Sequence, residues 1–228
     1  MNELNTEKNQ LMALVSHDLG SPFTAIKMWA NIINDSSKKE DLLEAKEMIL
    51  NTASFGLNTI KKILTIDKNE INDLNLQEVD IAQLLKTLYE RFKTEAEKKF
   101  IVLKIKVLQG KESVLTDKNL LERALQNLIS NAIKFSHKHT EVWVSVYEKN
   151  EEIVFEIKDF GIGISAIDQT RLFERYSELG NKPTGGESSN GLGLNIVKRI
   201  AEELGGTISV QSKLGEGSTF ALHLKYID

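Results

Sequence analysis

The chain has 228 residues, of which 41% are hydrophobic and 27% are charged, a composition typical of a folded protein with one large or two modest domains and not of a disordered one. Its net charge of −4 gives no overall attraction to nucleic acid or to an anionic membrane. The chain has no cysteine, which excludes disulfides and thiolate metal sites, so any metal must be held by oxygen or nitrogen. No apolar run approaches the roughly 18 residues that span a bilayer and the N-terminus has no secretory character, so we expect a cytoplasmic chain, which a longer full-length protein could anchor to a membrane.

In the first third of the chain, apolar residues recur every three or four positions, which predicts two amphipathic helices. One stripe runs from Met12 to Ile33 and the other from Leu42 to Ile63, and the polar segment 34–39 between them predicts an antiparallel hairpin. Further apolar residues widen both stripes: Leu11, Phe23, Ile32, Leu43, Leu50, Leu57 and Leu64. A single hairpin cannot cover this surface, so the pattern favours two hairpins in a four-helix bundle, hence a homodimer. The alternative is a hairpin packed on the rest of its own chain.

From Asn75 onward the hydrophobic period changes, and helices alternate with short strands. Asp80 with Gln83 and, later, Asp117 are typical of helix N-termini, whereas Gly205-Gly206 is typical of a helix end. We expect, in chain order, a strand over 76–79, a helix to Lys98, a strand over 100–108, a helix to Phe135, strands over 142–147 and 153–158 with a connection at 148–151, a helix over 192–204, and strands over 207–212 and 218–226. These elements predict an α+β sandwich with one mixed sheet.

His17 lies off the apolar stripe of the first helix, because its neighbours one turn away are Ala13, Leu14, Gly20 and Ser21. Pro22 cannot donate the hydrogen bond expected by the carbonyl of Asp18, so the helix should bend beside His17. The Asp18 carboxylate can orient the imidazole ring and accept its proton. This pattern is compatible with a reactive histidine, but an exposed helical histidine taken alone is more often an ordinary surface residue.

Asn127 and Asn131 are four residues apart on one helical face, and Lys134 follows one turn later. Two amide oxygens and an ammonium group suit Mg²⁺ together with phosphate oxygens. The alternative is a solvated polar face.

Eleven of the 14 glycines lie between Gly161 and Gly217. Glycine lets a ligand approach the main chain, and the helix that follows Gly191 offers unpaired N–H groups to phosphate. Plain turns would explain each glycine equally well.

Five motifs in this order resemble those of the two-component sensor histidine kinases. They are Ser-His17-Asp-Leu-Gly-Ser-Pro, Asn127 to Phe135, Asp159-Phe-Gly161-Ile-Gly163, Leu-Phe173-Glu-Arg175-Tyr176 and Asn-Gly191-Leu-Gly193-Leu194. The resemblance implies an α+β multidomain chain. Residues 1–74 would form a dimerisation and histidine phosphotransfer domain, and residues 75–228 an ATP-binding domain of the gyrase, chaperone and histidine kinase type (Bergerat fold).

The resemblance also implies roles for individual residues. His17 would be the phosphoacceptor and Asp18 its acid/base partner, while Ser21 occupies the position that places water for dephosphorylation of a response regulator. Asn131 would be the principal Mg²⁺ ligand with Asn127 assisting, and Lys134 would contact phosphate. Asp159 would accept from the adenine amino group, with Gly161 and Gly163 admitting the base and Thr219 near it. The other residues expected at the ATP site are Phe135, Ile164, Phe173, Arg175, Tyr176, Gly191, Leu192, Gly193 and Leu194.

The implied activity is autophosphorylation of His17 from ATP with Mg²⁺, followed by transfer to an aspartate of a response regulator receiver domain, with no nucleic-acid partner and with possible phosphatase activity. An upstream sensor domain is expected outside this chain, which would be a fragment of a longer protein or a cytosolic kinase that depends on another subunit. Ser189 replaces the first glycine of the last motif, which bears on the hinge of the expected lid over 177–190. One alternative is an ATPase clamp or anti-sigma serine kinase. Hydrolytic relatives have a glutamate base at the position of Asn127, so this asparagine argues against hydrolysis. The other alternative is a scaffold with a degenerate kinase domain.

Overall fold

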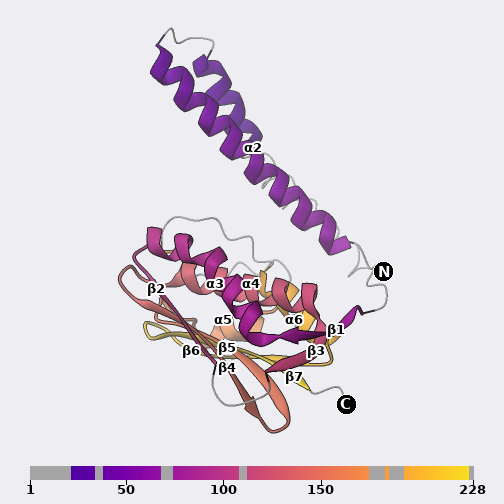
Figure 1. Cartoon of the computed structure of the whole chain (residues 1–228). Coiled ribbons are helices and arrows are strands. Elements are labelled where there is room, and N and C mark those ends of the chain that lie inside the picture. Colours follow the sequence, from indigo (N-terminus) through magenta and orange to yellow (C-terminus); the bar gives the residue numbers. More distant parts are fainter. Residues whose placement is uncertain are drawn as a thin grey trace, which may run out of the picture. The chain divides into compact units, whose positions relative to one another are not determined.

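The structure of the chain is a computed structural model that describes residues 22–33, 38–67, 74–107, 112–174, 183–184 and 193–225. The chain divides into two compact units, Met1–Asn72 and Asp73–Asp228 (Figure 1). Within the described residues, no helix is both long and apolar enough to cross a membrane.

The first unit contains a helix over residues 22–33 and the helix α2 (Lys39–Asp67). The two helices meet where the buried Pro22 lies against Gly56, since a Cβ atom at residue 56 would stand 3.6 Å from the proline ring. Ala45 is fully buried, whereas several large apolar side chains of both helices are exposed: Phe23, Met28, Ile33, Leu43, Met48 and Leu50. Of the residues expected to widen the apolar stripes, Phe23, Leu43 and Leu50 are therefore exposed in this unit.

The second unit has a five-stranded sheet in the order β2-β4-β5-β7-β6 and a separate two-stranded sheet of β1 and β3. The strands are β1 (Leu76–Asp80), β2 (Val102–Val107), β3 (Ser113–Asp117), β4 (Glu141–Lys149), β5 (Glu152–Asp159), β6 (Thr207–Lys213) and β7 (Gly217–Lys225). The larger sheet is mixed, because β2 and β4 are parallel and every other pair is antiparallel. The expectation of a single sheet is wrong, because β1 pairs with β3, a strand that the sequence pattern did not reveal.

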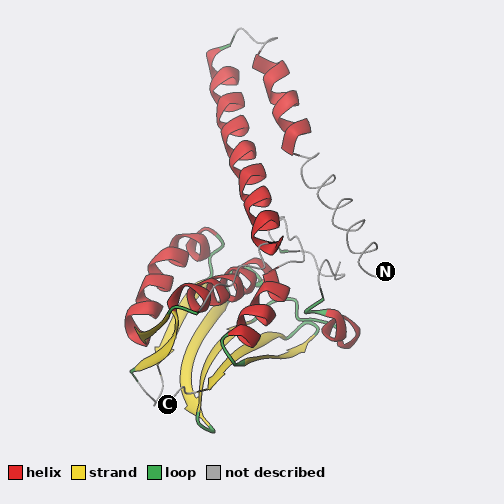
Figure 2. Ribbon diagram, turned by 90° about the vertical axis from the view of Figure 1, so that its right-hand side faces the viewer, coloured by secondary structure: helices red, strands yellow, loops and turns green. Residues whose placement is uncertain are grey.

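The helices α3 (Ile81–Lys98), α4 (Lys118–Phe135) and α6 (Gly193–Glu203) lie on one face of the five-stranded sheet (Figure 2). The side chains of Asp80 and Asp117 cap α3 and α4 as predicted, because each accepts a hydrogen bond from the first turn of its helix. The short helix α5 (Ala166–Arg171) was not expected. Apolar residues at helical spacing on α4 face the sheet: Leu121, Ala124, Leu125, Leu128, Ile129, Ala132 and Ile133.

The β4–β5 hairpin turns at Asn150 and Glu151, which both have positive φ angles, of 53° and 62°. This two-residue turn is shorter than the predicted connection at 148–151 and matches the right-handed twist of the strands. Residues 153, 155, 157 and 159 of β5 therefore face the helices, which places Asp159 on the inner face at the end of this strand.

Candidate functional site

The polar face of α4 carries two of the predicted site residues. The amide nitrogen of Asn127 donates to the carbonyl of Arg123 over 2.9 Å, which fixes the side chain and directs its oxygen away from the helix. A Cβ atom at Gly193 would stand 3.5 Å from Oδ1 of Asn127 and 3.6 Å from Nδ2 of Asn131. Both amides thus lie against the first residue of α6, where backbone N–H groups lack helical partners. Leu194, the next residue of α6, packs against the core.

The C-terminal end of α4 is held from two sides. The buried Lys99, just after α3, donates from Nζ to the carbonyls of Ile133 at 2.9 Å and Lys134 at 2.6 Å. The backbone N–H and the hydroxyl of Thr184 both lie 3.1 Å from the Lys134 carbonyl, and this hydroxyl is also 2.5 Å from the carbonyl of Ser136. A cation at a helix C-terminus is favourable because the unpaired carbonyls carry negative partial charge. These contacts fix the backbone of Lys134, whose side chain is partly buried.

At Gly161 and Gly163 the backbone of the protein itself leaves no room for a side chain. A Cβ atom at Gly161 would stand 2.1 Å from the carbonyl oxygen of Phe135, and one at Gly163, where φ is +66°, would stand 2.0 Å from the carbonyl of Lys213. The close approach that requires glycine at these positions is therefore made by the protein's own backbone. The N–H of Ile162 also donates to the Phe135 carbonyl, so this loop is tied to the end of α4.

Asp159 is the most strongly perturbed acid in the described part of the site. Its side chain is only 3% exposed, and Oδ1 accepts from the backbone N–H of Gly161 at 2.9 Å and of Ser218 at 3.2 Å. Burial raises the pKa of Asp159 to about 6, and the hydrogen bonds from Gly161 and Ser218 oppose that shift. A buried carboxylate with fixed donors on one oxygen can accept from a ligand donor.

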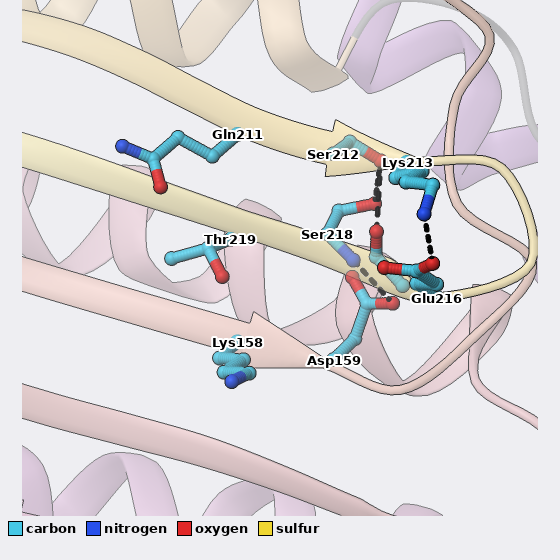
Figure 3. Close-up of a pocket in the computed structure, with 9 residues that line it drawn as sticks. Lys158, Asp159, Gln211, Ser212, Lys213, Glu216, Ser218 and Thr219 are labelled. Carbon is cyan, nitrogen blue, oxygen red and sulfur yellow. Dashed lines mark hydrogen bonds and ion pairs between the residues drawn. The ribbon is translucent and has the colours of Figure 1, made fainter.

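Thr219 lines the same pocket as Asp159 but projects from the other face of the sheet. Thr219 pairs with Lys158 and Gln211 on the neighbouring strands, so alternation places it on the sheet face opposite to Asp159. The neighbour of the carboxylate is Ser218. Figure 3 shows both side chains beside a pocket of about 300 Å³. The pocket is lined by Lys158, Asp159, Gln211, Ser212, Lys213, Glu216, Gly217, Ser218 and Thr219.

Ile164 and Phe173 belong to the supporting core. Ile164 is buried, and its N–H donates to the hydroxyl of Ser212 at 2.8 Å. Phe173 packs against the core, and its carbonyl accepts from the side chain of Asn195 on α6 at 2.9 Å. The remaining predicted site residues lie outside the described residues: His17, Asp18, Ser21, Arg175, Tyr176, Gly191 and Leu192.

No group of three histidine or acidic side chains suited to a metal ion occurs among the residues that the structure describes. The donor set expected from the sequence is instead the two amide oxygens of Asn127 and Asn131. Mg²⁺ is commonly held by one or two protein oxygens together with water and substrate phosphates, so this small set of oxygen donors fits it.

Residues 116–227 match the family model described as "Histidine kinase-, DNA gyrase B-, and HSP90-like ATPase". Over 225 residues the chain is 30% identical to the autoinducer 2 sensor kinase/phosphatase LuxQ of Vibrio parahaemolyticus, a match that covers 95% of this chain and 26% of LuxQ. It is 31% identical to the sensor-like histidine kinase SenX3 of Mycobacterium tuberculosis, covering 97% of this chain and 54% of SenX3. The chain carries the ATPase domain of a sensor histidine kinase.

The fold agrees with that of solved histidine kinases. The histidine kinase ThkA, in a crystal structure with the response regulator protein TrrA, superposes with a TM-score of 0.78 at 19% identity, covering 99% of this chain and 64% of that one. This chain spans about a quarter to a half of the sensor histidine kinases named above.

Four residues of the site were missed from the sequence: Lys99, Thr184, Ser212 and Ser218. Ser218 could have been found from the alternation of β7. Phe220, Leu222 and Leu224 face the core, and Ser218, two residues before Phe220, lies on the same face of the strand. Lys99 follows another lysine and gave no signal of its burial.

Proposed function

We propose that this chain is the catalytic core of a histidine kinase that transfers the γ-phosphoryl group of ATP to His17. The phosphoryl group then passes to an aspartate of a response regulator receiver domain. The observation that carries this proposal is the approach of Asn127 and Asn131 to the start of α6 at Gly193. Two amides and unpaired backbone N–H groups at this point suit a phosphate chain.

The proposed nucleotide contacts follow from the geometry of the second unit. Asp159 would accept from the 6-amino group of adenine, because its carboxylate is buried and held on one oxygen by Gly161 and Ser218. Asn131 and Asn127 would hold Mg²⁺ through their amide oxygens, and Lys134 would contact the phosphates. Mg²⁺, when bound, supplies positive charge against the phosphate oxygens. Arg175 would add a second cationic side chain.

The proposed reaction is an in-line phosphoryl transfer. A ring nitrogen of neutral His17 donates its electron pair to the γ-phosphorus, while the bond from that phosphorus to the bridging oxygen breaks and its electron pair leaves with ADP. Asp18 holds the N–H of the other ring nitrogen and so selects the required tautomer. The labile phosphorus–nitrogen bond then breaks as a carboxylate oxygen of the receiver aspartate attacks phosphorus, which regenerates His17.

The first unit would supply the dimer and the phosphoacceptor, and the divisions proposed are residues 1–74 and 75–228. Support comes from Phe23, Leu43 and Leu50, which are 61%, 55% and 57% exposed in this unit. A second copy would cover these side chains in a four-helix bundle. Ser21 keeps a hydroxyl that could place water for dephosphorylation of the regulator, so phosphatase activity is part of the proposal.

The test is incubation of the chain with γ-labelled ATP and Mg²⁺. The wild type should acquire label that is lost in acid and retained in alkali, as a phosphohistidine requires. His17→Gln should acquire none while its ATP affinity stays within about twofold, because nucleophile and nucleotide belong to separate units. His137→Gln, which changes an exposed histidine of the second unit, is the matched control and should label normally. Label that persists in His17→Gln would contradict the assignment.

A further inference from the structure

Two serines, Ser212 and Ser218, line the same pocket as the carboxylate of Asp159. Ser212 on β6 and Ser218 on β7 are register partners, and their hydroxyl oxygens are 2.9 Å apart. The backbone N–H of Ser218 donates to Oδ1 of Asp159 over 3.2 Å. Figure 3 shows the three side chains gathered at this end of the sheet.

The direction of these hydrogen bonds follows from counting protons. Each hydroxyl has one proton to donate, and a backbone carbonyl can only accept. The hydroxyl of Ser212 donates to the carbonyl of Gly217 over 2.9 Å, so the bond between the serines is donated by Ser218. The oxygen of Ser212 also accepts from the backbone N–H of Ile164 over 2.8 Å. Ser212 thus holds the carbonyl of the Gly217–Ser218 peptide, and the N–H of that same peptide donates to Asp159.

Through Ile164, Ser212 also contacts the loop 161–164, which follows Asp159 directly. The carbonyl of Ile162 accepts from the N–H of Gly215 at 2.8 Å, and the side chain of Gln169 donates to the carbonyls of Ile164 and Ser212 at 2.9 Å each. Ser212 is therefore the one side chain of the described residues that contacts both this loop and the serine beside Asp159.

We propose that Ser212 is a positioning residue, which holds the Gly217–Ser218 peptide and through its N–H orients the carboxylate of Asp159 toward the 6-amino group of adenine. This inference rests on the proposed function, because it assumes that Asp159 contacts the base. Ser212 itself touches no nucleotide. Its loss should therefore weaken the interaction that depends on the 6-amino group and leave the phosphate contacts unchanged.

The experiment compares two ligands, ADP and the diphosphate of purine riboside, which lacks only the 6-amino group, by calorimetry on the full chain. Ser212→Ala should weaken ADP binding about 3- to 10-fold, as expected for one hydrogen bond, and leave binding of the purine analogue unchanged. Ser212→Thr retains the hydroxyl and should bind ADP like the wild type. Ser209→Ala removes a hydroxyl from the opposite face of the same strand, where it contacts His223, and is the matched control.

Ser212→Cys keeps the size of the side chain but donates a weaker hydrogen bond, and should show part of the ADP-specific loss, which keeps the test decisive even if Ser212→Ala does not fold. Equal losses for ADP and for the purine analogue in Ser212→Ala, or no loss at all, would overturn the positioning role. A wild type that binds neither ligand would instead overturn the proposed function. The two failures are therefore distinguishable.

Discussion

The carboxylate of Asp159 accepts a hydrogen bond of 3.2 Å from the backbone N–H of Ser218, a residue 59 positions later in the chain. This bond joins the end of β5 to the beginning of β7. It occurs where Gly217 allows close contact, since a Cβ atom there would stand 2.2 Å from the carbonyl oxygen of Asp159. The backbone of β7 therefore supplies a fixed donor to the acid that we expect to recognise the base.

Nucleotide binding should depend on pH through Asp159. Because burial raises the pKa of this carboxyl to about 6, it is ionised above that pH and protonated below it. Only the ionised form is a full acceptor for an amino group. We expect the affinity for ADP, divided by that for the diphosphate of purine riboside, to be constant above pH 7. The ratio should fall as the pH decreases through 6, by no more than tenfold per unit.

Taking this ratio cancels the titration of the phosphate, whose second pKa is also about 6 and is common to both ligands. Asp159→Asn is the control, because its amide does not titrate and should give a ratio independent of pH. A constant ratio between pH 5 and 8 in the wild type would exclude the proposed contact between Asp159 and the 6-amino group.

Removal of the amide at Asn131 should weaken Mg²⁺-dependent ATP binding. Asn131→Ala deletes an amide whose interaction with a charged group contributes about 1.5 to 3 kcal/mol. This loss corresponds to roughly 10- to 150-fold in affinity. Asn127→Ala should cost less, because Asn127 is the assisting ligand. Titration with ATP in the presence of Mg²⁺ and of a chelator measures both effects. If Asn131→Ala binds as the wild type does with Mg²⁺, the metal is held elsewhere.

Gly163 should be required for stability, because a side chain at this position would collide with the backbone of Lys213. Gly163→Ala would place a methyl group 2.0 Å from the carbonyl oxygen of Lys213 at a φ angle of +66°. Gly215→Ala is a matched control, because Gly215 has a φ angle of +81° but nothing within 4 Å of its added Cβ. The control should lower the free energy of unfolding by only about 1 to 2 kcal/mol, which is the cost of a non-glycine residue in the left-handed conformation. Gly163→Ala should lose clearly more, as measured by denaturant titration, and equal losses would show that the contact is easily relieved.

The boundaries of α3 and α4 could be predicted because local chemistry sets them. Asp80 and Asp117 cap these helices, and the apolar period continues to their ends. β3 was missed because its five residues alternate too briefly to differ from a loop, and it is stabilised by pairing with β1. The sequence alone did not show which of Ser218 and Thr219 shares a sheet face with Asp159, because a shift of one residue along a strand exchanges the two faces. The burial of Lys99 depends on the end of α4, 34 residues away, which no local pattern records.

The exposed apolar surface of the first unit should make the chain a dimer. Burial of each side chain such as Leu43 or Leu50 contributes about 1.5 to 3 kcal/mol, so several per protomer outweigh an association cost of about 4 to 15 kcal/mol. The intact chain should therefore have a dimeric mass by light scattering at micromolar concentration. Leu50→Asp should shift this mass toward the monomer, because a charge in the interface loses its hydration.

The control for this substitution is Asn51→Asp, which changes the charge by the same amount at the next, exposed position of α2. Asn51 lies about 100° further round the helix than Leu50, so a dimer that buries the leucine stripe should tolerate Asn51→Asp. Circular dichroism distinguishes a folded monomer from an unfolded hairpin in Leu50→Asp. A monomeric mass of the wild type at tens of micromolar would contradict the four-helix bundle, because the apolar stripe would then have to be covered by the rest of the same chain.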